Sequence, residues 1–223
     1  MNESEELAAV SAFAAEKLGG TGGCHDLDHT RRVLANAEKL LEEIPEADPF
    51  CVKMAVWLHD TARPEEDSSS GNCCHARLGA EIAGNYLEQR NIPEYLRHKI
   101  VQAVLRHRYR GNIYPETIEE KIVFDADKLD SLGAVGIGRA FLFAGKCGAR
   151  LHNTASEALN SPAYSIEDTA YREYLVKLRK LPEVMQTAPA RRIAAERTKV
   201  MQEFFAALDK EIGFVPDMEG KNK

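Results

Sequence analysis

Aromatic residues are scarce in this sequence. They make up 7% of its 223 residues, and runs of β-branched residues are also few. Both kinds of side chain favour strands, so their scarcity favours helices over a β-sheet. The hydrophobic content of 44% is nevertheless enough to bury a core, and the length suits one substantial domain. The composition therefore predicts an all-α protein.

The sequence also lacks a long apolar run. No segment approaches the roughly 18 apolar residues that a membrane-spanning helix needs. The first ten residues, MNESEELAAV, are acidic and lack the basic-then-apolar order of a secretory signal. We therefore expect no membrane span and a cytoplasmic location.

The cysteines lack the spacing of a disulfide or zinc framework. There are five, at positions 24, 51, 73, 74 and 147, and no two of them form a CxxC pair. An odd number without that spacing argues against a disulfide framework and against a structural zinc site. We interpret the adjacent Cys73 and Cys74 as reduced thiols at the start of a helix.

Basic clusters are absent as well. The net charge is -6, and no long run of Lys and Arg occurs. Duplex nucleic acid needs a clustered basic face that replaces its counterions, so the sequence excludes it as a partner. A small anionic substrate is compatible with this charge, because arginines and a metal ion can dominate the potential within a site. Nothing in the sequence predicts the oligomeric state.

Hydrophobic periodicity predicts helices along the chain, without internal repeats or an interdomain linker. The expected helices cover about residues 4–18, begin near 28, cover 49–62, 73–90, 93–107 and 116–141, and include two more in the C-terminal third. A polar, acidic loop is expected after residue 62. Residues 1–223 are predicted to form a single domain, on which residues 160–215 pack as a helical extension.

Histidines and carboxylates in apolar surroundings are the main functional signal. His29, His59, Asp60 and Asp127 each belong to an otherwise apolar helical segment. Burying a carboxylate there is costly unless a cation or hydrogen bonds compensate its charge. Two imidazoles and two carboxylates suit an octahedral Mn²⁺, Mg²⁺, Fe²⁺, Ni²⁺ or Co²⁺ ion with positions open for water and substrate. These four residues are the predicted metal ligands.

Five segments together resemble the HD-domain superfamily of metal-dependent phosphohydrolases. They are HDLDHTRRV (25–33), AVWLHDTAR (55–63), CHARLGAEIA (74–83), VLRHRYRG (104–111) and FDADKLDSLGAVGIGRAF (124–141). The C-terminal segments KLRKLPEVMQT and AAERTKVMQEFF look like the tail of small bacterial and archaeal HD hydrolases. The resemblance covers most of the chain. It implies an all-α HD-domain helical bundle with additional C-terminal helices and the same four metal ligands.

The resemblance also bears on three further acidic or histidine side chains. Residues at the positions of His75 and His107 hold a second metal in some HD proteins and act toward substrate phosphate in others. We favour a role toward substrate or in orienting a ligand, and therefore one metal ion, with two ions as the alternative. Asp130 is expected to orient a metal ligand, because outer carboxylates commonly fix ligand histidines.

The predicted activity is metal-assisted hydrolysis of a phosphate ester or anhydride. Arg32, Arg63 and Lys128 are the predicted contacts to the substrate phosphate, and the resemblance suggests a nucleotide as substrate. Two alternatives stay open: an HD-type di-iron oxygenase with six filled ligand positions, and a non-catalytic nucleotide sensor. Iron content with oxygen consumption would identify the first, and nucleotide binding without turnover the second. His152, by contrast, is expected at the surface.

Overall fold

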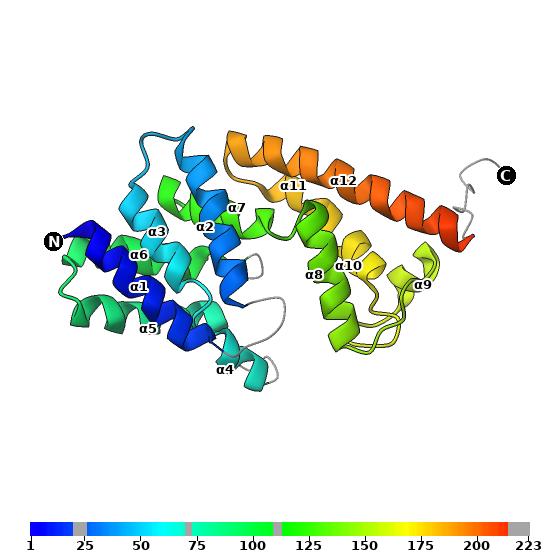
Figure 1. Cartoon of the computed structure of the whole chain (residues 1–223), viewed down its shortest axis with the longest axis horizontal. Helices are drawn as coiled ribbons and strands as arrows, with labels where there is room; N and C mark the ends of the chain where they lie inside the picture. Colours follow the sequence, from blue (N-terminus) through cyan, green and yellow to red (C-terminus); the bar gives the residue numbers. More distant parts are fainter. Residues whose placement is uncertain (20–25, 70–72, 109–112, 214–223) are drawn as a thin grey trace. The chain divides into compact units, whose positions relative to one another are not determined.

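The computed structural model describes residues 1–19, 26–69, 73–108 and 113–213, and the regular elements of these residues are helices (Figure 1). The all-α prediction is thus confirmed. The chain divides into two compact units, of which the first contains Met1–Asp130 and Met185–Ala190 and the second contains Ser131–Val184 and Arg191–Lys223. None of the helices in the described part of the chain is long and apolar enough to cross a membrane.

The first unit is built around one central helix. Its helices are α1 (Glu3–Leu18), α2 (Leu27–Leu41), α3 (Pro49–Leu58), α4 (Arg63–Ser68), α5 (His75–Gln89), α6 (Glu94–Arg106) and α7 (Ile118–Leu129). Almost every residue of α3 is buried, and α3 packs against α1, α2, α5, α6 and α7. Asp48 caps its start by accepting hydrogen bonds from the backbone of Phe50 and Cys51, with Pro49 in the first turn. The apolar sequence of α3 therefore becomes the core of this unit.

The structure differs from the predicted elements at several places. The helix predicted over 49–62 ends at Leu58, and the C-terminal third contains more helices than the two predicted. The acidic stretch after residue 62 is not a loop throughout but includes the short helix α4, whose first turn accommodates Pro64. The helix predicted over 116–141 is interrupted: α7 ends at Leu129, and α8 (Gly133–Lys146) begins only after a break. Gly133 has a φ of +72°, a conformation that favours glycine and does not continue a right-handed helix.

The second unit contains the remaining helices. These are α8, α9 (Ala155–Asn160), α10 (Ala170–Val176), the 3-10 helix η1 (Leu178–Lys180), α11 (Leu181–Val184) and most of α12 (Ala188–Ile212). The rings of Tyr174 and Phe205 stack at a centroid distance of 4.7 Å within it. The expectation of a surface position for His152 was wrong, because His152 is buried and its Nε2 lies 2.5 Å from Asp209 Oδ1. The packing of residues 160–215 on a single domain stays a prediction.

Candidate metal centre

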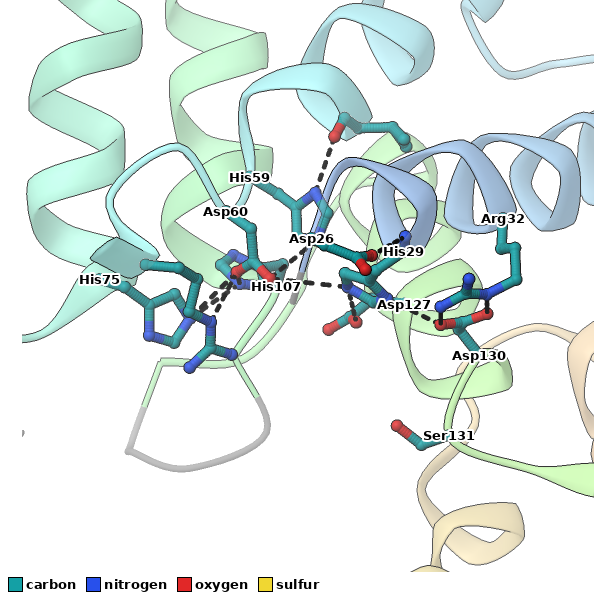
Figure 2. Close-up of polar contacts among 12 residues, drawn as sticks. Asp26, His29, Arg32, His59, Asp60, His75, His107, Asp127, Asp130 and Ser131 are labelled. Carbon is teal, nitrogen blue, oxygen red and sulfur yellow. Dashed lines mark hydrogen bonds and ion pairs between the residues drawn. The ribbon is translucent and has the colours of Figure 1, made fainter. Parts of the chain in front are cut away.

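Six buried side chains converge within the first unit, and the four predicted ligands are among them (Figure 2). They are His29 from α2, His59 and Asp60 from the end of α3, His75 from the start of α5, His107 after α6, and Asp127 from α7. Asp26 caps α2 by accepting a hydrogen bond from the backbone N–H of His29, which fixes the first turn of that helix. Separate helices thus deliver these side chains to one place in the unit.

The carboxylate of Asp60 lies between two pairs of imidazoles. Its Oδ2 is 3.5 Å from His29 Nε2 and 3.6 Å from His59 Nε2. Its Oδ1 is 3.6 Å from His75 Nε2 and 3.6 Å from His107 Nε2. Each carboxylate oxygen therefore faces its own pair of ring nitrogens.

The same side chains form two groups that could each hold an ion. Within each group the candidate ligand atoms lie within 4.8 Å of one another. The groups are His29 with His59 and Asp127, and Asp60 with His75 and His107. Asp127 joins the first group through Oδ1, which is 3.4 Å from His29 Nε2. The predicted ligands are therefore divided between two adjacent groups, and the second includes both histidines whose role the sequence left open.

Every imidazole in the centre uses its Nδ1 for a contact to an accepting oxygen. The pairs are His59 with Val56 O at 2.7 Å, His107 with Val104 O at 2.6 Å, His29 with Asp130 Oδ2 at 2.7 Å, and His75 with Glu66 Oε2 at 2.7 Å. A carbonyl or carboxylate oxygen accepts hydrogen bonds and donates none. Each Nδ1 therefore carries a proton, and in a ring that is neutral the Nε2 presents its lone pair to the centre.

Burial keeps at least two of these rings neutral. It lowers the pKa of His59 to about 4 and that of His75 to about 2. Burial also opposes ionisation of Asp127, but Lys128 and His29 outweigh it and hold the pKa of that carboxyl well below its usual range. Neutral imidazoles and an ionised carboxylate are the protonation states that metal ligation requires.

The side chains of the centre could hold a cation. The Nε2 atoms of His75 and His107 are 3.1 Å apart. The Nε2 of His59 is buried and has no hydrogen-bond partner among the residues that the structure describes. Buried ring nitrogens that face one another in this way are costly unless a cation or a proton lies between them. Nitrogen and oxygen donors in this number suit one or two divalent ions.

Asp130 connects one ligand to a predicted phosphate contact. While its Oδ2 faces His29 Nδ1, its two oxygens accept hydrogen bonds from Arg32 Nε at 2.8 Å and Arg32 Nη2 at 3.1 Å. The arginine fixes the carboxylate in a bidentate pair. Asp130 therefore has the contacts of a residue that orients His29.

The other two predicted phosphate contacts are also paired with carboxylates. Arg63 Nε donates to Asp60 Oδ1 at 3.1 Å. Lys128 Nζ lies 2.5 Å from Asp127 Oδ2 and donates to His107 O at 2.9 Å. Lys128 has only 10% of its side chain exposed, whereas 37% of the Arg32 side chain is exposed. Of the predicted cations, Arg32 is thus the most accessible to a ligand.

Two acidic residues of this unit have positions that the sequence did not indicate. Glu66, on α4, contacts His75 and was not singled out, because nothing in the periodicity relates it to a residue nine positions later. Asp125 faces away from the centre, and its oxygens accept from Gln186 N, Thr187 N and Thr187 Oγ1 at 2.7–2.8 Å. It anchors the segment Met185–Ala190 within the first unit.

Known proteins resemble the chain over nearly its whole length. A family model described as "HD domain" matches residues 26–132. The Bacillus subtilis protein YpgQ is 31% identical over 220 residues, which cover 95% of this chain and 96% of YpgQ. The crystal structure of YpgQ in complex with ADP matches with a TM-score of 0.74 and 28% identity, covering 99% of this chain and 100% of that one. An HD-superfamily hydrolase from Bacillus thuringiensis matches with a TM-score of 0.73 and 27% identity, covering 96% and 100%.

Proposed function

The chain belongs to the HD-domain superfamily. We propose that it is a metal-dependent phosphohydrolase that acts on a phosphate ester or anhydride. We further propose that its substrate is a nucleotide. The observation that carries the proposal is the pair of adjacent ligand groups, with one oxygen of Asp60 facing the histidines of each. The crystal structure of the related YpgQ in complex with ADP supports the proposal of a nucleotide substrate.

Two ions fit the centre better than one. The sequence alone favours a single ion held by His29, His59, Asp60 and Asp127. In the structure Asp60 has one oxygen toward each pair of imidazoles, so one ion would be held by His29, His59 and Asp127 and a second by Asp60, His75 and His107. Bound divalent ions would lower the pKa of a water molecule and polarise a phosphoryl oxygen.

The surrounding side chains would orient the ligands and the substrate. Asp130 holds the ring of His29, and the backbone carbonyls of Val56 and Val104 hold two further rings. Such outer contacts set the tautomer and the direction of each lone pair. Arg32, as the most exposed of the paired cations, is the side chain that we propose to contact the phosphate chain.

A di-iron oxygenase is the second candidate function. The observation in its favour is that six ligand side chains are gathered, as such an enzyme requires. The two functions differ in what they consume. Iron loading with substrate-dependent oxygen uptake, in the absence of phosphate release, would favour the oxygenase.

The proposal is tested on the full chain, stripped with a chelator and reloaded separately with Mn²⁺, Mg²⁺, Fe²⁺, Co²⁺ and Ni²⁺. A panel of nucleoside mono-, di- and triphosphates and simple phosphate esters is then assayed for release of phosphate or pyrophosphate. We expect turnover of at least one nucleotide with one of these ions. Binding of nucleotides without turnover under every condition would favour the sensor and contradict the proposal.

A matched pair of substitutions ties any activity to the centre. Asp60→Asn should abolish release, because the amide removes a negative charge from the proposed ligand set. Asp28→Asn is the control: it makes the same chemical change on an exposed carboxylate of α2 that pairs with Arg31. Activity that survives Asp60→Asn at the wild-type level would belong to a contaminant or to another site.

A further inference from the structure

Glu66 is a buried carboxylate that contacts one histidine of the centre and that the sequence analysis does not name. It is 8% exposed and lies on α4, shortly after the pair His59 and Asp60. Its Oε2 is 2.7 Å from His75 Nδ1 and accepts a hydrogen bond from Arg63 Nη1 at 2.7 Å. Its Oε1 is 3.3 Å from Arg108 Nη2. Two guanidinium groups therefore hold the carboxylate against a single imidazole.

His75 needs such a partner because of its place in the chain. His59 and His107 follow helices, and each donates its Nδ1–H to the carbonyl three residues earlier. His75 is the first residue of α5, so no preceding turn of its own helix supplies that carbonyl. The acceptor has to come from elsewhere, and Glu66 supplies it.

Glu66 is also coupled to the central carboxylate. Arg63 donates through Nη1 to Glu66 and through Nε to Asp60 Oδ1, the oxygen that faces His75 and His107. One guanidinium therefore sets the distance between Asp60 and Glu66. His75 closes the ring of contacts, with Nδ1 on Glu66 and Nε2 toward Asp60.

We infer that Glu66 is a positioning residue that fixes His75 in the Nδ1–H tautomer and directs its Nε2 lone pair toward Asp60 and His107. The effect of Glu66 on metal binding rests on the proposed metal centre. The effect of Glu66 on the tautomer of His75 does not depend on that proposal, because it is measured in the metal-free protein. A purely structural role of Glu66 in holding α4 would leave the tautomer of His75 unchanged.

The first test reads the tautomer directly. The chain is labelled with ¹⁵N-histidine, stripped of metal, and studied at neutral pH by long-range ¹H–¹⁵N correlation, with His75 assigned from the spectrum of His75→Asn. In the wild type, His75 Nδ1 should be protonated and Nε2 bare. In Glu66→Gln the amide group can face the ring with its NH₂, so a substantial population should carry the proton on Nε2 instead.

Matched variants separate positioning from structure. Glu65→Gln makes the same chemical change at the neighbouring residue of α4 and should leave His75 unchanged. Glu66→Asp keeps the charge beside Arg63 and Arg108, but its shorter side chain moves the oxygen away from the imidazole ring. A population of His75 with the proton on Nε2 should therefore appear in this variant too. This variant decides the question if Glu66→Gln does not fold.

The second test counts ions. Titration of the stripped protein with Mn²⁺, followed by metal analysis after dialysis, should give two ions per wild-type chain. Glu66→Gln should lower the affinity for the ion at Asp60, His75 and His107 by about 10–100-fold, the usual effect of losing a residue that orients a ligand. The affinity for the ion at His29, His59 and Asp127 should not change. If the wild type bound no ion, the proposed function would fail while the tautomer result stood. Protonation of wild-type His75 on Nε2, or a tautomer unaffected by both Glu66 variants, would overturn the inference.

Discussion

Asn substitution at Asp127 should weaken metal binding, whereas Asn substitution at Asp125 should lower stability, although only Ala126 separates the two residues in α7. Asp127 Oδ1 faces His29 Nε2 at 3.4 Å, and its carboxyl is ionised at neutral pH because its pKa is held well below the usual range. Asp127→Asn removes that charge from the proposed ligand set. Metal affinity should fall by more than the roughly 10–100-fold that an outer residue such as Asp130 costs.

Asp125→Asn should not change the affinity for metal but should lower the free energy of unfolding. The amide can keep one acceptor for Gln186 N, but its NH₂ then faces the backbone N–H of Thr187, which loses its buried acceptor. An unsatisfied buried donor costs about 1–3 kcal/mol, and the lost charge adds to this. A loss of about 2–3 kcal/mol lowers the Tm of a chain of this size by about 5–10 °C.

The measurements are equilibrium dialysis with Mn²⁺ and calorimetry of the metal-free protein. Asp28→Asn, on an exposed carboxylate, should change neither quantity. Asp130→Asn should be intermediate in metal affinity, because Asp130 holds the ring of His29 rather than facing the ions. If Asp125→Asn lost the metal and Asp127→Asn retained it, the assignment of ligands would be wrong.

Three further predictions concern the same centre. His59→Ala and Asp60→Ala should each abolish metal binding and hydrolysis together, and a variant that kept full occupancy in metal analysis would contradict their role as ligands. Saturating Mn²⁺ should raise the Tm of the wild type but not that of Asp60→Asn; at 100 times the Kd each ion contributes about 2.7 kcal/mol, so equal shifts in scanning calorimetry would argue against this site. Burial lowers the pKa of His59 to about 4, so the unfolded chain, whose imidazole titrates near 6.5, binds more protons between these values. The stabilisation is therefore complete above about pH 6.5 and is lost as the pH falls toward 4, with about 2 kcal/mol gone by pH 5; urea denaturation of the metal-free protein that is equally easy at pH 7 and pH 5 would refute this.

Helical periodicity narrows the choice between Asp125 and Asp127 as a ligand but does not make it. Asp125 and Asp127 are about 200° apart around a helix, so only one can face a given centre. The resemblance to HD proteins selected Asp127, and the structure places Asp125 against Gln186 and Thr187 instead. Periodicity failed where α7 ends, because the positive φ of Gly133 depends on the local backbone and not on the apolar pattern.

The sequence did not predict which helices pack against one another. The division of the ligands into two groups depends on how α3, α5 and α6 pack, since Asp60 meets His75 and His107 only through that packing. The contact of Glu66 with His75 likewise requires α4 to bring its carboxylate to the start of α5. Periodicity reports which face of a helix is buried, and it carries no information on what lies across from that face.

The pairing of charges around the centre explains why a phosphate ligand should depend on the ions. Among the described residues, four cationic side chains around the centre lie within 3.3 Å of a carboxylate oxygen: the pairs are Arg32 with Asp130, Arg63 with Asp60, Lys128 with Asp127 and Arg108 with Glu66. Within this set the positive and negative charges balance. Divalent ions held by the same carboxylates would supply the attraction for a phosphate chain. We therefore expect a nucleotide to bind the metal-loaded protein much more tightly than the stripped one, and we expect Arg32 to add more to this binding than the other three cations.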